Sequence, residues 1–276
     1  MRIVVCVKEV LDPDAVGAYA VAGRLEIDDD GRLAQTTIPR LINGYDEQAL
    51  EAALRLRDAG LDCEIRVVSV ATDAIAVLRH ASSLGADEVV AVEPPEAGVD
   101  CHVVAALLAG YLRTCGGADL VLCGRQASDD DQGVVPALLG ELLGLPVVTV
   151  AREVAPAGSP EVPAVRVTRV TPDGDEVVEA PCPSVVTISS ELGAPRYPTM
   201  PMKMAARRVQ PTVVRAGDLG LSGEELAARA VPVRQFVPAV KGDCELVTGS
   251  PTEAADRLVE LLVAERVLQP RQRQVT

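Results

Sequence analysis

The sequence predicts an α/β fold with a doubly wound, mostly parallel sheet. Short apolar runs recur up to residue 150, and most of them are followed by a segment with helical periodicity. The runs contain few polar residues, which is typical of parallel strands that helices cover on both faces. Strands that alternate with helices in this way favour right-handed crossovers within one sheet.

The predicted elements begin with a buried strand at residues 2–7. A polar stretch follows, in which 24–27 and 33–38 bracket Asp28-Asp29-Asp30-Gly31, a pattern that predicts a hairpin. A helix opens at 43–46, where Asp46 is a candidate N-cap. The further elements up to residue 150 are strands at 63–70, 88–92, 119–123 and 147–150, and helices at 73–84, 98–114 and 134–143, the last ended by Gly144.

The alternation changes after residue 150. Residues 165–170 and 176–179, joined by Asp173-Gly174-Asp175, predict an antiparallel hairpin, and 184–188 predicts a strand that returns to the main sheet. Residues 191–211 have little periodicity and a basic cluster (Lys203, Arg207 and Arg208), which is typical of a partner-binding segment. The tail ends in an amphipathic helix near 252–267. We therefore expect an α/β domain at 1–190, a partner-recognition loop at 191–211, and an extended C-terminal arm at 212–276 that packs on a partner subunit.

Composition limits the classes of partner. The chain has 276 residues and a formal net charge of −14, and only 2% of its residues are aromatic. Acidity and few aromatic side chains argue against nucleic acid and anionic membranes as general partners. No apolar run approaches the roughly 20 residues of a membrane span, so no direct membrane insertion is expected. Seven cysteines without CxxC spacing indicate reduced thiols, and we expect a cytoplasmic protein.

The signals for catalysis are weak. Neither GxGxxG after the first strand nor GxxxxGK[ST] occurs, which argues against the common Rossmann and P-loop nucleotide sites. The two histidines, His80 and His102, fall within predicted helices, and no catalytic triad is visible. We therefore assign no catalytic residue and no metal ligand.

The strongest binding signal is the polar loop at 124–135. The carboxyl ends of parallel strands meet at one edge of a sheet, so this loop should lie beside Lys8, 43–46 and 69–72. Backbone N–H groups at the start of the following helix favour a phosphate. The triplet Asp129-Asp130-Asp131 then has two interpretations: acids that cap the helix, or carboxylates on ribose hydroxyls while Arg125 meets phosphate. A divalent metal is a lesser alternative.

Four motifs, in order along the chain, resemble the β subunit of electron transfer flavoproteins, including its FixA-like members. They are the opening strand Val4-Val5-Cys6-Val7-Lys8, the helix start at 43–53 (NGYDEQALEAA), the loop at 124–131 (GRQASDDD) and the segment 191–201 (ELGAPRYPTMP). The resemblance spans roughly residues 1–235, and the segment 191–201 is the most diagnostic of the four.

The resemblance implies a heterodimer in which an α subunit carries most of the FAD site and this chain adds an adenine-nucleotide site, usually for AMP. The implied fold is that of adenine-nucleotide-binding (HUP-like) α/β proteins. The residues implied for the nucleotide are Cys6, Asn43, Tyr45, Asp46, Val70, Gly124, Arg125, Gln126, Ala127, Ser128, Asp129, Asp130, Asp131, Gln132, Gly133, Val134 and Val135. Tyr45 is also implied to lie near the flavin. The residues implied for partner docking are Leu192, as an exposed anchor, and Pro195, Arg196 and Tyr197.

The implied function is that of an electron carrier. The heterodimer would accept electrons from flavin-dependent dehydrogenases and pass them to a membrane quinone oxidoreductase, and this chain would carry out no reaction on a substrate. Better-known members continue with Asn-Gln-Thr-Gly after the aspartates, where this chain has Gln132-Gly133-Val134-Val135-Pro136. This departure leaves phosphate to backbone amides or changes the nucleotide. Two alternatives stay open: an electron-bifurcating, NADH-oxidising flavoprotein with a second FAD at the loop, and a stand-alone AMP- or ATP-binding regulatory module.

Overall fold

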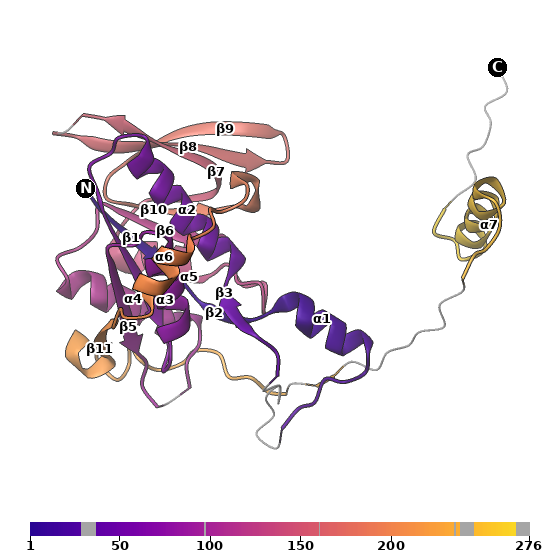
Figure 1. The fold of residues 1–276 in the computed structure, drawn as a ribbon, viewed down its shortest axis with the longest axis horizontal. Helices are drawn as coiled ribbons and strands as arrows, with labels where there is room; N and C mark the ends of the chain where they lie inside the picture. Colours follow the sequence, from indigo (N-terminus) through magenta and orange to yellow (C-terminus); the bar gives the residue numbers. More distant parts are fainter. Residues whose placement is uncertain (29–36, 97, 160, 235, 238–245, 269–276) are drawn as a thin grey trace. The chain divides into compact units, whose positions relative to one another are not determined.

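The computed structural model describes all residues except 29–36, 97, 160, 235, 238–245 and 269–276, and within them the main body is built around a nine-stranded sheet (Figure 1). The strand order is β11-β5-β4-β1-β6-β10-β7-β8-β9. Pairing is parallel from β11 to β7 and antiparallel from β7 to β9. The predicted doubly wound, mostly parallel α/β fold is confirmed.

The central strands carry the apolar runs of the sequence. β1 (Arg2–Cys6) pairs in parallel with β4 (Glu64–Val70) on one side and with β6 (Leu120–Gly124) on the other. Successive side chains of a strand point to opposite faces, and both faces of β1 are buried, in two separate core clusters. The other strands of the parallel part are β5 (Glu88–Glu93), β7 (Val147–Gly158), β10 (Ser184–Ile188) and β11 (Thr212–Arg215).

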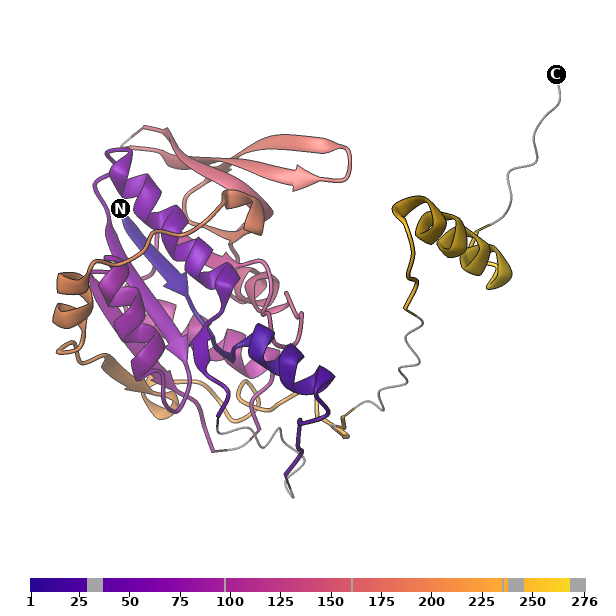
Figure 2. The ribbon, with the colours of Figure 1, turned by 45° about the vertical axis from the view of Figure 1, so that its right-hand side comes forward.

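Helices cover both faces of this sheet (Figure 2). α2 (Gly44–Asp58) and α3 (Ile75–Leu84) pack on one face, in the cluster that includes Ile3 and Val5. α4 (Cys101–Thr114) and α5 (Val135–Leu143) cover the other face, in the cluster that includes Val4 and Cys6. α5 ends as predicted at Gly144, which adopts a left-handed conformation with φ of 66°.

β7 changes partner along its length. Its first residues pair in parallel with β10, and from Ala151 onward it pairs antiparallel with β8 (Pro163–Thr171), which in turn pairs with β9 (Gly174–Pro181). The change lies next to Val150, a β-branched residue with φ of 61° whose N–H donates to Thr187 Oγ1 at 2.9 Å. The predicted β8–β9 hairpin is confirmed, and β7 continues to Gly158 instead of ending at residue 150.

The structure adds elements that the sequence patterns did not indicate. They are α1 (Pro13–Val21), the antiparallel pair β2 (Glu9–Leu11) and β3 (Arg40–Ile42), the short helix α6 (Met200–Ala206), the edge strand β11, and the 3-10 turns η1 (Ser190–Leu192) and η2 (Ala216–Leu219). The hairpin predicted around Asp28-Asp29-Asp30-Gly31 falls largely on 29–36, outside the described residues.

The chain divides into two compact units, Met1–Val237 and Pro238–Thr276. The second unit contains α7 (Pro251–Ala264), the predicted amphipathic helix. α7 opens with a capping box, in which Ser250 and Glu253 each accept the other's backbone N–H through their side chains. Across the described part of the chain, no helix combines the length and the apolar character that a membrane crossing needs.

Candidate functional site

The polar loop lies at the carboxyl edge of the parallel sheet, as predicted. β4, β1 and β6 are neighbours, so the chain leaves them side by side after Val70, Cys6 and Gly124. The loop connects β6 to α5, and the first turn of α2 is hydrogen-bonded to it. A crevice at the carboxyl ends of parallel strands is the usual ligand position in this fold class.

Asn43 fixes the shape of the loop from the start of α2. Its side chain is 1% exposed. Its Nδ2 donates to the Gln126 carbonyl at 2.9 Å, and its Oδ1 accepts the Ser128 N–H at 3.1 Å. Its own N–H donates to the Lys8 carbonyl at 2.8 Å. Through its side chain and its backbone N–H, Asn43 therefore joins the start of α2 to the loop and to Lys8, two residues after β1.

Asp46, also on α2, binds the residues that follow β1 and the end of β6. Its Oδ2 accepts the Lys8 N–H at 2.8 Å and its Oδ1 accepts the Gly124 N–H at 2.9 Å. The prediction that Asp46 caps α2 is wrong, because Asn43 occupies the N-cap position and both oxygens of Asp46 are engaged by other strands' ends. The carboxyl is buried, and it holds β1 and β6 to α2.

Burial gives Asp46 a pH-dependent effect on stability. Burial disfavours the ionised form and raises the pKa of Asp46 from 3.8 to about 7, against the lowering effect of the two backbone N–H donors. Between these values the folded protein keeps a proton that the unfolded chain has lost. The free energy of unfolding should therefore fall, by at most about 4 kcal/mol, as the pH rises from about 4 to about 7, and then level off. Urea unfolding from pH 4 to pH 8 measures this, and Asp46→Asn should remove that part of the slope; an unchanged slope in the variant would contradict the assignment.

The three aspartates of the loop are held by partners of their own. Lys8 Nζ lies 2.7 Å from Asp129 Oδ1 and 3.3 Å from Asp130 Oδ2, and Asp131 accepts a bond from the Gln126 side chain at 2.9 Å. Burial alone would lower the pKa of Lys8, but the two carboxylates raise it. The interpretation of these acids as helix caps is wrong. The N-cap of α5 is Val134, which has no side-chain cap bond.

Several polar groups at this edge have no partner among the described residues. Arg125 Nε and Ser128 Oγ in the loop, and Ser69 Oγ in β4, are buried without a hydrogen bond in that part of the chain. Within the described ranges, the N–H groups of Gly133 and Val134 at the start of α5 also lack an acceptor. Buried polar atoms are normally hydrogen-bonded, and an uncapped helix start binds anions. The donor set therefore fits a phosphate-bearing ligand.

The other residues expected to hold the nucleotide occupy this edge as well. Arg125 stacks on the Tyr45 ring, with its guanidinium carbon 5.2 Å from the ring centroid. Cys6 faces Cys123 across the β1–β6 pair, and both are buried in the core on the α4 side. Val70 ends β4 and is half-buried. The loop is closed internally by the Ala127 N–H, which donates to the Gln132 carbonyl at 3.0 Å.

The predicted docking segment, residues 191–197, exposes a different side chain from the one expected. Leu192 is 7% exposed and packs in the core cluster with α2, so the prediction of an exposed Leu192 side chain is wrong. Tyr197 is 91% exposed, and Met200 and Met204 on α6 are exposed as well. Arg196 is engaged by Glu51 and Asp58 of α2. Docking by this segment stays a prediction.

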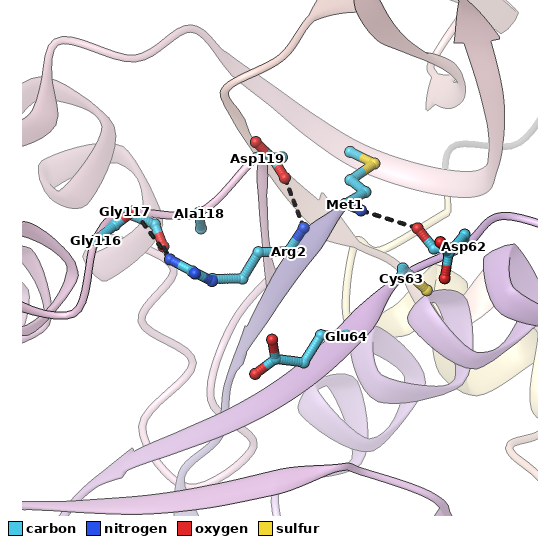
Figure 3. Close-up of a pocket in the computed structure, with 9 residues that line it drawn as sticks. All are labelled: Met1, Arg2, Asp62, Cys63, Glu64, Gly116, Gly117, Ala118 and Asp119. Atoms are coloured by element: carbon cyan, nitrogen blue, oxygen red, sulfur yellow. Dashed lines mark hydrogen bonds between the residues drawn. The ribbon is translucent and has the colours of Figure 1, made fainter. Parts of the chain in front are cut away.

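The opposite, amino edge of the sheet contains a hollow that the N-terminus lines (Figure 3). The Arg2 guanidinium donates to the carbonyls of Cys115, Gly116 and Gly117, and the Asp119 carboxylate accepts the Arg2 N–H at 2.6 Å. The terminal amino group donates to the Asp62 carbonyl at 2.9 Å. These bonds tie β1 to the turn before β6, although Arg2 Nε is buried there without a hydrogen-bond partner among the described residues.

Fold and site together define an α/β protein with a ligand site, suited to phosphate, at the carboxyl edge of a parallel sheet. The family model described as "Electron transfer flavoprotein domain" matches residues 30–219. The chain belongs to the electron transfer flavoprotein family, as a member of the β-subunit group. Proteins of this group transfer electrons, bind flavin and pair with an α subunit.

The relatives match over nearly the whole chain. The caffeyl-CoA reductase–Etf complex subunit CarD of Acetobacterium woodii is 32% identical, over 97% of this chain and 100% of its own. The electron transfer flavoprotein subunit beta of Thermoanaerobacterium thermosaccharolyticum is 31% identical over the same shares. The subunit of the same name from Megasphaera elsdenii is also 31% identical, over 97% of this chain and 100% of its own. The chain is therefore similar to these proteins over nearly its whole length.

The sequence did not indicate contacts between residues that are far apart along the chain. Lys8 was expected beside the loop, but its pairing with two aspartates was not. Gln48, Glu51 and Arg55 on α2, which bind the docking segment, were not assigned any role. Their spacing along one helix face was visible, yet their acceptors and donors lie more than 130 residues away and become neighbours only in the fold.

Proposed function

We propose that this chain is the β subunit of a heterodimeric electron transfer flavoprotein. The heterodimer accepts electrons from flavin-dependent dehydrogenases and delivers them to a membrane quinone oxidoreductase. FAD, shared with the α subunit, supplies the redox chemistry when bound. The chain itself acts by binding: it holds a nucleotide, shields the flavin and docks partners. The observation that carries this proposal is the loop 124–135, locked by Asn43 and Asp46 onto α2, within a chain of this family.

We infer that the loop holds AMP. The N–H groups of Gly133 and Val134 and the Arg125 guanidinium suit a phosphate, since helix starts and arginine both favour anions. Asp129 and Asp130 are partly exposed and have acceptor oxygens for ribose hydroxyls, while Lys8 offsets their charge. The loss of polar side chains in the stretch Gln132-Gly133-Val134-Val135-Pro136 is compatible with this, because backbone groups supply the donors.

Co-expression with the α subunit tests the function directly. We expect a stable heterodimer with a flavin spectrum, which a substrate-reduced flavin-dependent dehydrogenase bleaches. Failure to form a flavin-containing heterodimer would rule the proposal out. A stand-alone AMP- or ATP-binding module predicts instead a flavin-free monomer or homodimer, and the family match over most of the chain argues against it.

A second candidate is suggested by one relative. CarD is named as a subunit of a caffeyl-CoA reductase–Etf complex. In this second candidate function, the chain belongs to a reductase assembly of the electron-bifurcating kind, with a second FAD at the loop and NADH as donor. Two FAD per heterodimer, and flavin reduction by NADH without a dehydrogenase, would favour this candidate over the carrier.

Partner docking should depend on Tyr197 more than on Leu192. Tyr197→Ala removes an exposed aromatic ring, and aromatic side chains contribute most to interfaces. We expect electron transfer from the dehydrogenase to slow by about tenfold, with flavin content and thermal stability unchanged. Leu192→Ala removes a buried side chain and should lower stability by about 2–3 kcal/mol. Stopped-flow reduction and thermal unfolding separate the two variants; an unaffected transfer rate in Tyr197→Ala would contradict this assignment.

A further inference from the structure

Helix α2, whose first turn fixes the nucleotide loop, also binds the docking segment through residues further along the helix. Gln48, one turn after Asn43, donates to the carbonyls of Ser190 and Gly193 at 3.3 and 3.2 Å. Two turns further on, Arg55 donates to the carbonyls of Leu192 and Ala194 at 2.9 and 3.3 Å. The backbone of 190–194 thus lies on the polar face of α2, which supplies donors for its carbonyl groups.

Glu51 is the central acceptor of this arrangement. It is 6% exposed. Its carboxylate accepts the Arg196 N–H at 3.2 Å, Arg196 Nε at 2.8 Å and Arg196 Nη2 at 3.4 Å, and it also accepts Arg55 Nε at 2.8 Å. Burial alone would raise the pKa of Glu51, but the bonds from Arg196 and Arg55 lower it. Asp58, the last residue of α2, also accepts a hydrogen bond from Arg196 Nη2, at 2.7 Å.

These bonds determine what the segment presents to solvent. Between η1 and α6 the segment has no regular secondary structure, so side chains of α2 are what fix its backbone. With Arg196 held against α2 by both its side chain and its N–H, the next residue, Tyr197, is directed away from the body and is 91% exposed. With Arg55 on the Leu192 carbonyl, Leu192 stays in the core. Charge-assisted and bidentate bonds of this kind are the stronger and more directional ones.

We propose that Glu51 is a positioning residue for partner docking: it fixes Arg196, and through Arg196 it orients Tyr197 toward the electron-transfer partner. Glu51 is itself buried on α2, so it acts through Arg196. This inference rests on the proposed docking role of 191–197, but the contact between Glu51 and Arg196 can be tested without any partner.

The first test is amide hydrogen exchange in the purified heterodimer. Glu51→Gln keeps the size of the side chain and one acceptor oxygen but removes the charge, and peptides that cover 190–197 should exchange about tenfold faster. Glu47→Gln is the matched control, because Glu47 lies on the same helix and pairs with His80 instead. Unchanged exchange at 190–197 in Glu51→Gln would overturn the proposal. Arg196→Gln, on the surface segment, gives the same readout if Glu51→Gln does not assemble.

The second test separates positioning from folding. With a substrate-reduced flavin-dependent dehydrogenase as probe, Glu51→Gln should raise the KM for the heterodimer about tenfold and leave kcat, flavin content and chemical reduction by dithionite unchanged. The double variant Glu51→Gln/Arg196→Gln should be no worse than either single variant, since both remove the same interaction. A fall in kcat with loss of flavin, or additive effects, would overturn the role. If no dehydrogenase reduces the parent heterodimer, the proposed function fails. The hydrogen-exchange result still shows whether Glu51 fixes the backbone of 190–197.

Discussion

Gly124→Ala should abolish nucleotide binding and lower the stability of the protein by about 3 kcal/mol, or roughly 5–10 °C in Tm. A methyl group at this position would lie 2.7 Å from Tyr45 Cβ and 2.8 Å from the Tyr45 carbonyl carbon, and it would also meet a carboxylate oxygen of Asp46. Real Cβ atoms do not approach backbone so closely. The first turn of α2 would have to move away from β6, which breaks the bond from the Gly124 N–H to Asp46.

The matched control is Gly44→Ala at the first residue of α2. A methyl group there meets nothing within 4 Å, and alanine favours helix over glycine. Gly44→Ala should therefore retain the parent's stability or exceed it. Thermal unfolding and the nucleotide content of both purified variants give the comparison. Equal stability and equal nucleotide content in the two variants would show that α2 and β6 are not packed as described.

Asn43→Ala should release the nucleotide loop while leaving the sheet intact. The change leaves the part-buried Gln126 carbonyl and Ser128 N–H without their partners, at a cost of about 1–2 kcal/mol. The loop then loses the conformation that brings Arg125, Gly133 and Val134 to one ligand. We expect nucleotide content to fall at least tenfold in dialysed protein, whereas far-ultraviolet circular dichroism stays that of the parent.

Asn43→Asp tests the donated bond by itself. The carboxylate still accepts the Ser128 N–H, but its second oxygen replaces the donor and faces the Gln126 carbonyl oxygen, so we expect a loss at least as large as in Asn43→Ala. Nucleotide content well below that of the parent in both variants supports the loop as the binding element. A nucleotide that stays fully bound in Asn43→Ala would place it elsewhere.

The sequence predicted the parts of the fold that continuous patterns specify. The inner residues of β1, β4, β5, β6 and β10 are mostly apolar because they are buried between helices on both faces, and such runs are visible without knowledge of their neighbours. β11 escaped prediction because it is a short, partly exposed edge strand with a weak pattern. α1 has a start signal, with Asp12 capping two N–H groups and Pro13 in the first turn, but it lacks a clear apolar stripe.

The sequence predicted where the site lies, but it did not predict which residues contact one another there. Parallel strands bring their carboxyl ends together, which placed Asn43, Asp46 and the loop at one edge. Asp46 looked like a cap because its partners, Lys8 and Gly124, are distant in sequence. The triplet of aspartates also suggested a cap by local rules, whereas Lys8 holds two of them across the edge. Local propensity cannot anticipate such contacts, because pairing across the sheet decides them.

Extraction and mass analysis of the nucleotides bound to the purified heterodimer test the central claim most directly. The carrier proposal predicts one FAD and one AMP per heterodimer in the parent, and one FAD without AMP in Asn43→Ala. Two FAD per heterodimer would favour the bifurcating candidate at the same loop. Parent heterodimer that yields a single FAD and no second adenine nucleotide would contradict the claim that residues 124–135 form a nucleotide site.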